Sequence, residues 1–206
     1  MSMKDKKTAG FTPTPKNFGV SSRSERGFTL IETLVAVSLL VISIAGPMSL
    51  AAQSLASAFY ARDQMTAFHL AQEAVEAVRY VRDRNILINN AAGTPVVDLL
   101  DGIPDTTGRP FTVDVRFNDP ADSMTLCDGA CDPLEYNADL SLYGYGTTGD
   151  WLATRFTRSV AVTMVGSSND EIKVAVEVRW RSGAYQERAF TMSENMHRWL
   201  PDTTSE

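Results

Sequence analysis

One carboxylate, Glu32, stands inside the most apolar stretch of the chain, and its surroundings call for a chemical explanation. After Glu32 no charged residue appears until Arg62. At about 1.5 Å per residue, roughly 20 apolar residues cross a hydrocarbon core of about 30 Å, so residues 28–52 are long enough to span a membrane as a helix. A carboxylate in hydrocarbon costs on the order of 3 kcal/mol, which makes Glu32 a candidate for function.

A glycine–aromatic junction precedes this apolar stretch. The sequence there reads Arg26-Gly27-Phe28-Thr29-Leu30-Ile31-Glu32. If the chain is cut after Gly27, the new amino terminus at Phe28 lies four residues before Glu32, about one helical turn away on the same face. The ammonium and the carboxylate could pair within one subunit or between two subunits. The plain alternative is a carboxylate near the membrane surface that reaches back to water.

This junction resembles the type IV prepilin signature, in which a basic leader ends in glycine and is followed by an aromatic or apolar residue, Thr-Leu-Ile-Glu and a long apolar helix. The resemblance covers the seven-residue motif and the apolar run. It implies cleavage after Gly27 by a prepilin peptidase, N-methylation of Phe28 and a role for Glu32 in assembly between subunits. It also implies other pilin subunits and a pilus or secretion assembly machinery as partners. Residues 67–85 resemble the amphipathic half of the helix in minor pilins and secretion pseudopilins.

The charge distribution predicts an orientation in the membrane. The chain has 206 residues and a net charge of −6, but residues 1–27 carry +4 and the remainder carries −10. A basic segment before an apolar one is expected to stay cytoplasmic, which places the carboxy-terminal body outside the cytoplasm. The acidic body argues against binding of nucleic acid by the body as a whole. A secretory signal peptide would have a shorter apolar region with a cleavage site after it.

The two cysteines, Cys127 and Cys131, are close together in sequence and are predicted to form a disulfide in a body outside the cytoplasm. The loop it would close is small, so its stabilisation is expected at the low end of about 2–4 kcal/mol. A zinc site would need two more ligands, and the histidines His69 and His197 are far away in the sequence. The spacing also differs from the Cys-x-x-Cys of redox pairs.

The segment 118–150 around these cysteines is predicted to be a long loop insertion. It is crowded with acids, but the alternating spacing of a calcium-binding hand is absent. The acids are Asp119, Asp122, Asp128, Asp132, Glu135 and Asp139. The aromatic residues Tyr143, Tyr145 and Trp151 could form a contact surface for a partner or pack the insertion onto the sheet. We find no phosphate-binding loop, nucleophile elbow or zinc-protease motif, so no catalytic residue, cofactor or metal is predicted, and the chain is not expected to be an enzyme.

The order of the elements predicts an α+β fold in which a long amino-terminal helix packs on a small antiparallel sheet. We expect a leader at residues 1–27, an apolar helical half at 28–52, an amphipathic half at 53–89 and a sheet domain at 90–206. Pro47 predicts a kink, or a locally melted stretch at residues 45–50. The stripe expected to contact the sheet consists of Leu55, Phe59, Leu70, Ala74, Ala77, Val78 and Val81, and charged residues such as Asp63 and Arg82 are expected off it.

Alternation of apolar and polar residues predicts the strands. They are expected at residues 111–117, 155–165, 171–181 and 184–192, with a tight turn at Ser182-Gly183 and an antiparallel meander of the last three. The inner faces are expected to include Phe117 and Met164. The tail at residues 193–206 could be a short helix or a final strand that packs through Trp199.

These patterns predict a structural subunit of a type IV pilus or related filament, anchored by one membrane-crossing helix and extending into a filament outside the cytoplasm. The motif and the Gln72–Glu76 stretch favour a minor pilin or pseudopilin over a major pilin. The alternative is a single-span membrane protein whose extracytoplasmic domain binds a ligand or acts as an enzyme. Whether the filament belongs to a pilus, type II secretion or DNA uptake stays open.

Overall fold

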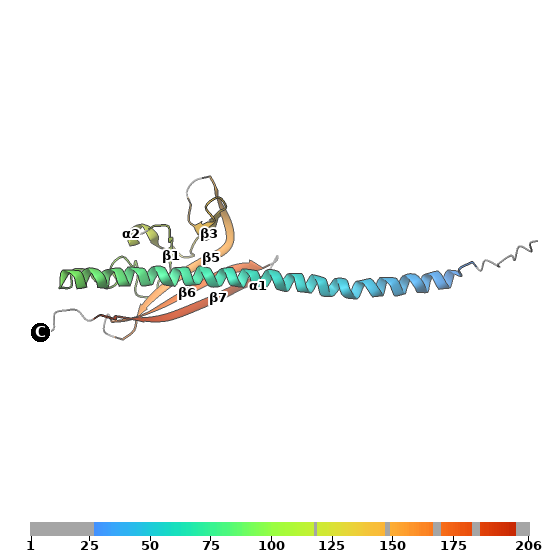
Figure 1. Cartoon of the computed structure of the whole chain (residues 1–206), viewed down its shortest axis with the longest axis horizontal. Helices are drawn as coiled ribbons and strands as arrows, with labels where there is room; N and C mark the ends of the chain where they lie inside the picture. The colour runs from blue at the N-terminus through green and yellow to red at the C-terminus, as the bar shows by residue number, and fades with distance from the viewer. Residues whose placement is uncertain (1–26, 118, 147–148, 167–169, 183–185, 201–206) are drawn as a thin grey trace, which may run out of the picture. The chain divides into compact units, whose positions relative to one another are not determined.

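The computed structural model describes residues 27–117, 119–146, 149–166, 170–182 and 186–200 (Figure 1). The expected leader, apart from Gly27, and the expected turn at Ser182-Gly183 therefore lie largely outside the described residues. The chain divides into two units, residues 1–51 and 52–206. The architecture is the predicted α+β arrangement of one long amino-terminal helix and an antiparallel sheet, consistent with a pilin fold.

The first element is helix α1, Leu30–Ala92, which begins two residues after the start of the predicted apolar half and ends three residues after the predicted amphipathic half. Gly93 follows the helix with a positive φ of 68°, a conformation that favours glycine. Asn89, buried in the last turn, holds the exit loop: its side-chain carbonyl accepts hydrogen bonds from the backbone N–H of Val96 and Val97, and its amide donates to the carbonyl of Val97. The end of α1 is thus fixed by local hydrogen bonds.

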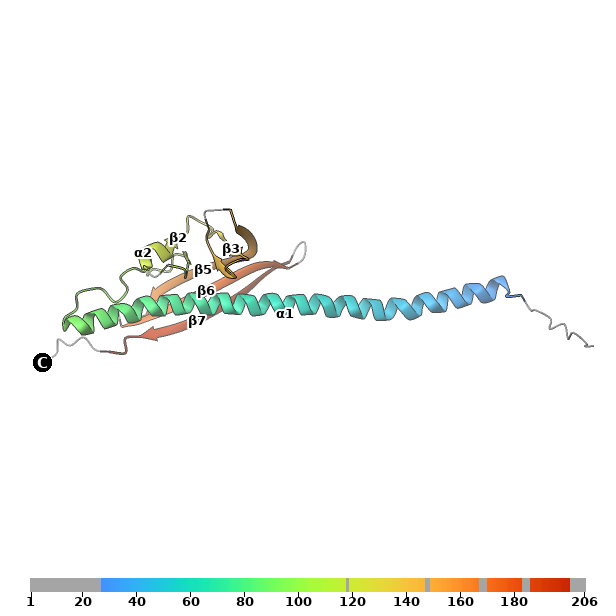
Figure 2. The ribbon, with the colours of Figure 1, turned by 45° about the horizontal axis from the view of Figure 1, so that its top comes forward.

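Within the described residues, seven strands form one sheet whose pairings are antiparallel (Figure 2). Strand β5 is central: one edge pairs with β6, and the other edge pairs with β1 and β3. Strand β7 pairs with β6, which completes the predicted meander. The small elements are β1 (Phe111–Val113), α2 (Pro120–Ser123), β2 (Met124–Leu126), β3 (Pro133–Asn137) and β4 (Leu142–Gly144); the long strands are β5 (Trp151–Met164), β6 (Glu171–Ser182) and β7 (Gln186–His197).

The core of residues 52–206 lies between the second half of α1 and one face of this sheet. The predicted inner face of β6 is confirmed, since alternate residues from Ile172 to Trp180 are buried. From α1 the buried side chains are mainly small, which lets the helix lie close to the sheet. The buried apolar side chains of α1 are Ala67, Leu70, Ala71, Ala74, Val75, Val78, Val81 and Ile86.

The predicted stripe of α1 is wrong at its beginning. Leu55 and Phe59 are about half exposed, because the sheet comes beside α1 only from the region of Tyr60, where Arg188 of β7 lies over the ring. Two charged residues that were expected off the stripe, Asp63 and Arg82, are buried instead. Each has an ion-pair partner that offsets the loss of solvation.

Three strand predictions need correction. The first strand stops at Val113 because the Asp114 carboxylate accepts a hydrogen bond from the backbone N–H of Arg116 and turns the chain, so Phe117 is 47% exposed. Met164, at the end of β5, is 43% exposed rather than inward-facing. The last strand continues to His197, which settles the tail as a strand, while Trp199 is mostly exposed and donates its indole N–H to Asp83.

The predicted loop insertion at residues 118–150 holds regular structure within its described residues. It contributes α2, β2, β3 and β4, and both β2 and β3 join the sheet. The strands were missed because each has only three to five residues and is interrupted by proline, glycine and aspartate. A short strand that pairs with a long neighbouring strand has too few residues to show a clear alternation of apolar and polar side chains in the sequence.

Candidate processing and assembly site

The first turn of α1 is organised by Thr29 and Glu32. The carbonyl of Thr29 accepts hydrogen bonds from the backbone N–H of Glu32 at 3.0 Å and of Thr33 at 3.2 Å, and its hydroxyl also accepts from Glu32 N–H at 3.3 Å. Thr29 is therefore the N-cap of the helix, and Glu32 is its third residue. A carboxylate at this position is favoured by the partial positive charge of the helix amino terminus.

The peptide bond between Gly27 and Phe28 lies just before the helix, between two exposed residues outside regular secondary structure. Phe28 is 79% exposed, and a side chain added at Gly27 would meet nothing within 4 Å. The fold of the chain therefore places no steric demand for glycine at this position. If Gly27 matters, it matters to something that acts on the junction.

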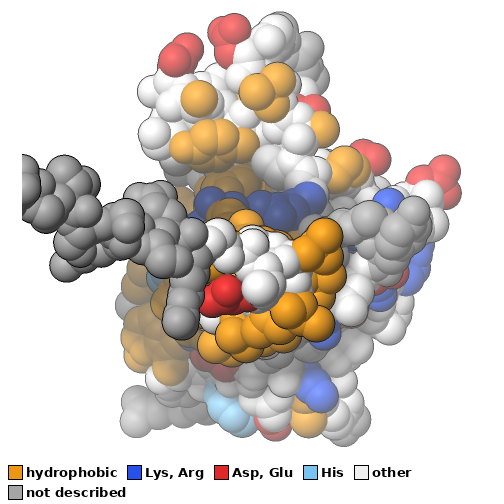
Figure 3. Space-filling model, turned by 90° about the vertical axis from the view of Figure 1, so that its right-hand side faces the viewer, with side chains coloured by type: hydrophobic (Ala, Val, Ile, Leu, Met, Phe, Trp, Pro, Cys, Tyr) orange, Lys and Arg blue, Asp and Glu red, His pale blue; other side chains and the backbone are white. Residues whose placement is uncertain are grey.

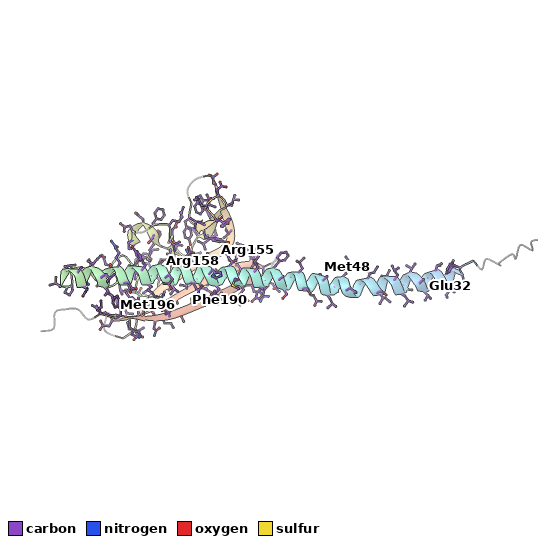
Figure 4. The ribbon with its side chains drawn as sticks, in the orientation of Figure 1. Glu32, Met48, Arg155, Arg158, Phe190 and Met196 are labelled. Atoms are coloured by element: carbon purple, nitrogen blue, oxygen red, sulfur yellow. A yellow bond between two sulfur atoms is a disulfide. The ribbon has the colours of Figure 1, made fainter. Side chains whose placement is uncertain are left out.

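The part of α1 that follows has an apolar surface on all sides. Residues 27–62 are exposed, and α1 is the helix in the described part of the chain that is long and apolar enough to cross a membrane. Glu32 and Met48 mark this part of the helix in Figure 4. Two of its hydroxyl groups are bonded within the helix: Ser38 donates to the carbonyl of Leu34 and Ser43 to that of Leu39. Such a surface fits lipid or the apolar helices of other subunits.

Pro47 lies inside α1, and the helix continues through it. The predicted alternative of a melted stretch at residues 45–50 is therefore wrong for this structure. In a helix, the proline ring removes only one backbone hydrogen bond, and the flanking turns can retain theirs. The kink at Pro47 stays a prediction.

Comparisons with known proteins identify the class of this amino-terminal segment. The family model described as the prokaryotic N-terminal methylation motif matches residues 22–46, a span that includes Gly27, Phe28 and Glu32. The chain thus carries a type IV prepilin-like motif at the start of a pilin-like α+β fold, which supports a pilin-like precursor with a membrane-anchoring helix. Proteins with this motif are structural rather than enzymatic. Neither the curated proteins nor the solved structures gave a match.

The two cysteines, Cys127 and Cys131, form a disulfide in the loop between β2 and β3. The backbone N–H of Cys127 donates to the carbonyl of Pro110, which ties the disulfide loop to the start of β1. Among the described residues, no group of three histidine, cysteine, aspartate or glutamate side chains could hold a metal ion. His69 is exposed and contacts the ring of Phe68 edge-on.

The aromatic residues after β4 pack around one arginine. The guanidinium of Arg116 lies 4.2 Å from the ring centre of Trp151 and pairs with Asp114 at 2.5 Å. Gly144 and Gly146 make room for this arrangement, since an added Cβ would come within 2.6 Å of Arg116 or 2.0 Å of Trp151. These contacts show that Trp151 packs the β3–β4 region onto the turn after β1, the second of the two roles that the sequence left open.

Electrostatics reinforce this packing. Burial alone would raise the pKa of the Asp114 carboxyl, but hydrogen bonds from the Arg116 side chain and from the backbone N–H groups of Tyr145 and Arg116 lower it overall. Burial raises the pKa of Tyr145 to about 12, against the opposing effect of the Arg158 charge. Tyr145 therefore remains a neutral phenol throughout the physiological range.

Two ion pairs that attach β5 to α1 were missed by the sequence analysis. Arg158 is fully buried and donates to Glu73 at 2.8 Å, and Arg155 lies 3.1 Å from the buried carboxylate of Asp63. Both arginines lie where β5 meets α1 (Figure 4). For Arg158 a signal existed, because it shares its face of β5 with Phe156 and Val160. A charge on an inward-facing position of a strand implies a partner on the element that covers it.

Proposed function

We propose that this chain is the precursor of a structural subunit of a type IV pilus or a related filament. In this proposal residues 1–27 are removed as a leader, the new amino terminus at Phe28 is methylated, and α1 first anchors the chain in the membrane and then packs with other subunits. The observation that carries the proposal is the position of Glu32, in the first turn of an exposed apolar helix and directly after the accessible Gly27–Phe28 bond.

The geometry suggests how assembly would use this carboxylate. Phe28 and Glu32 are four residues apart, so in a helix extended to Phe28 the terminal ammonium and the carboxylate would lie on the same face, about 6 Å or one turn apart along the axis. Thr29 caps the helix with its own hydroxyl, which leaves the Glu32 carboxylate available to a neighbouring chain. Among packed apolar helices water is scarce, so an ammonium there is strongly favoured to contact a carboxylate of another subunit.

The first measurement is the intact mass and amino-terminal sequence of the protein isolated from a membrane fraction. The proposal predicts a chain that begins at Phe28 and is heavier by one methyl group. A chain that begins at Met1 or Ser2, in cells with active prepilin peptidase, would contradict the proposal and leave a plain membrane anchor. Release of the protein together with filaments when cells are sheared would further support its role as a filament subunit.

The variant Gly27→Leu tests the junction itself. Since a side chain at residue 27 meets nothing in the fold, the substitution should leave the body folded. We expect the substituted chain to stay uncut and to remain in the membrane fraction, because a branched residue replaces the glycine on the leader side of the bond. Normal processing of Gly27→Leu would show that the peptidase does not recognise this glycine.

A further inference from the structure

Two arginines from different elements share one buried carboxylate in the body, residues 52–206, near the end where β5 begins. The carboxylate of Asp63 in α1 is buried and lies 3.1 Å from Arg155 of β5 and 3.8 Å from Arg62 of α1. The side chains of Arg155 and Arg62 are 42% and 64% exposed, so one buried negative charge holds two accessible positive charges. Figure 4 shows Arg155 and Met196 near opposite ends of the sheet. Figure 3 views the molecule from the end near Arg155 and shows a group of Lys and Arg side chains in blue.

Aromatic side chains accompany these two arginines. The guanidinium of Arg62 lies 5.5 Å from the ring centre of Phe59, which is about half exposed. Burial raises the pKa of the Tyr143 phenol, and the charges of Arg155 and Arg62 oppose this rise, so Tyr143 lies close to both arginines. We call the surface formed by Arg62, Arg155, Phe59 and Tyr143 the arginine corner.

The arginine corner is one surface, on the side of the sheet that faces α1. Arg158 points to α1, and strict alternation would turn Arg155, three residues earlier, to the other side. The pairing of β3 with β5 is irregular between Pro133 and Glu135, and such an irregularity changes the direction of side chains. Arg155 therefore also reaches α1, where it meets Asp63.

An acidic loop lies at the opposite end of the body, directly after α1. Residues 93–108 contain three aspartates and no basic residue. Asp98 and Asp101 are exposed, and the apolar side chain of Val96 beside them is 57% exposed. We call Val96, Asp98 and Asp101 the acidic loop.

Two buried side-chain amides hold the acidic loop in place. Asn85 donates to the carbonyls of Leu99 at 3.1 Å and Asp101 at 2.9 Å. The side-chain carbonyl of Asn89 accepts a hydrogen bond from the backbone N–H of Val96 at 2.9 Å. The exposed carboxylates are thus carried by a fixed backbone, which lowers the entropy lost when they bind a partner.

The arginine corner and the acidic loop are too far apart to meet within one chain. Arg62 and Asn85 belong to the same helix and are separated by roughly 35 Å at about 1.5 Å per residue. Two complementary surfaces at opposite ends of one body fit a contact between copies that point in the same direction. A contact of this head-to-tail kind can repeat without closing and produces an open row of subunits.

We propose that the arginine corner of one subunit binds the acidic loop of a second copy of this chain. The guanidinium groups of the corner pair with the carboxylates of the loop, and Val96 packs beside Phe59. The two copies are then shifted by roughly 35 Å along α1. This inference rests on the filament of the proposed function, and it adds that several copies of this chain follow one another in that filament.

Cysteine cross-linking of the full chain in cells tests this contact. Because Cys127 and Cys131 are bonded to each other, Phe59→Cys with Val96→Cys supplies the thiols that a short bismaleimide can join, and every charge is kept. Sheared filaments are then analysed by immunoblot. We expect a ladder of dimers, trimers and longer products, because each chain offers both sides of an open contact. Either substitution alone should give no ladder.

The matched control is Arg181→Cys with Val96→Cys. Arg181 is exposed and lies towards the same end of the sheet as Arg155, since its neighbour Trp180 pairs with Phe156. It follows the buried Trp180 in β6, however, and therefore points to the opposite face of the sheet. This control should give no ladder above the single substitutions.

Charge reversal tests what holds the two copies together. Arg62→Glu, added to the cross-linking pair, places like charges opposite each other and should lower the yield of the ladder roughly tenfold. Adding Asp101→Lys as well should restore most of the yield, and this recovery would exclude misfolding as the cause of the loss. An unchanged ladder with Arg62→Glu would overturn the pairing of charges.

The outcomes separate this inference from the proposed function. Filaments that contain the protein but give no ladder would overturn the contact and leave the proposed function intact. Products that stop at dimers, or that join a different protein, would also overturn a repeated contact between copies of this chain. Absence of the unsubstituted protein from sheared filaments would instead contradict the proposed function itself.

Discussion

Arg158 occupies an inward-facing position of β5, and two backbone carbonyls and one carboxylate accept hydrogen bonds from its guanidinium. One terminal nitrogen donates to the carbonyl of Leu70 at 2.9 Å and to Glu73 at 2.8 Å, and the other donates to the carbonyl of Val113 at 2.5 Å. One guanidinium thus joins α1, β1 and β5. A buried charge of this kind adds little net stability over an apolar residue, but it is costly to leave unpaired.

Replacing Glu73 tests this pair. We expect Glu73→Ala to lower the free energy of unfolding by about 2 kcal/mol, because it leaves the buried guanidinium without its counter-charge. The matched control is Glu76→Ala, one turn away, whose partner Arg79 is partly exposed. That substitution should cost below about 1 kcal/mol. Urea unfolding of the detergent-solubilised protein, followed by tryptophan fluorescence, measures both; equal effects would contradict the special role of the buried pair.

Tyr145 gives a prediction for alkaline pH. Its pKa of about 12 in the folded chain lies above the value of about 10 for an unfolded tyrosine, so the folded state holds the phenol proton more tightly. The stability that this provides is complete below about pH 10 and is lost as the pH rises towards 12. Tyr145→Phe lacks the ionisable group, so its stability should fall less steeply than that of the wild type over this range. Urea unfolding at a series of pH values gives the slope of the unfolding free energy against pH for both proteins. Identical slopes would contradict a raised pKa of Tyr145 in the folded chain.

At the scale of elements, the long strands could be predicted from the sequence, whereas the short strands could not. A strand such as β6 buries five alternate apolar residues, so its period appears directly in the sequence. The boundaries of β1 and β3 depend on partners that are not neighbours in the sequence, such as Ser123 for Asp114 or Thr154 for Leu134. Local propensity cannot report hydrogen bonds that form only after the chain has folded.

The same contrast applies to the candidate site. The junction at Gly27, Phe28 and Glu32 could be predicted because it is contiguous and chemically unusual. The ion pair between Arg155 and Asp63 could not, since its two members lie on different elements, β5 and α1, and meet only when the sheet packs on the helix. Sequence therefore predicts sites that lie in one segment better than sites built from several elements.

The disulfide loop is an element whose contribution can be measured alone. Replacing Cys127 and Cys131 with serine should lower the free energy of unfolding by about 2 kcal/mol, the entropic value for a five-residue loop. The loop carries the contact of Cys127 with Pro110, so a larger effect would show that it also positions β1. Unfolding with and without a reducing agent measures the difference, which should vanish when the wild type is reduced.

At the scale of the whole molecule, the chain combines a helix surface that water cannot solvate well with a body that folds around its own core. Residues 27–62 leave their apolar side chains exposed, whereas the second half of α1 is covered by the sheet. The exposed surface must be covered by lipid or by other helices. Its hydrophobic free energy differs little between these two environments. Direction and register of assembly must then come from polar groups, and Glu32 is the charged residue available between Phe28 and Arg62.

Glu32→Val therefore separates anchoring from assembly. The variant keeps the Gly27–Phe28 junction and a fully apolar span, so we expect normal cleavage and membrane insertion. Its incorporation into filaments should fall at least about tenfold, because the ammonium of a neighbouring subunit would have no counter-charge among apolar helices. The control is Thr33→Val, whose hydroxyl bonds only within the helix to the carbonyl of Leu30. Immunoblots of sheared filaments and membranes, with masses of the membrane form, measure both steps. If Glu32→Val entered filaments as well as the control, the register of subunits would have to come from the body, and the carboxylate would only interact favourably with the helix amino terminus.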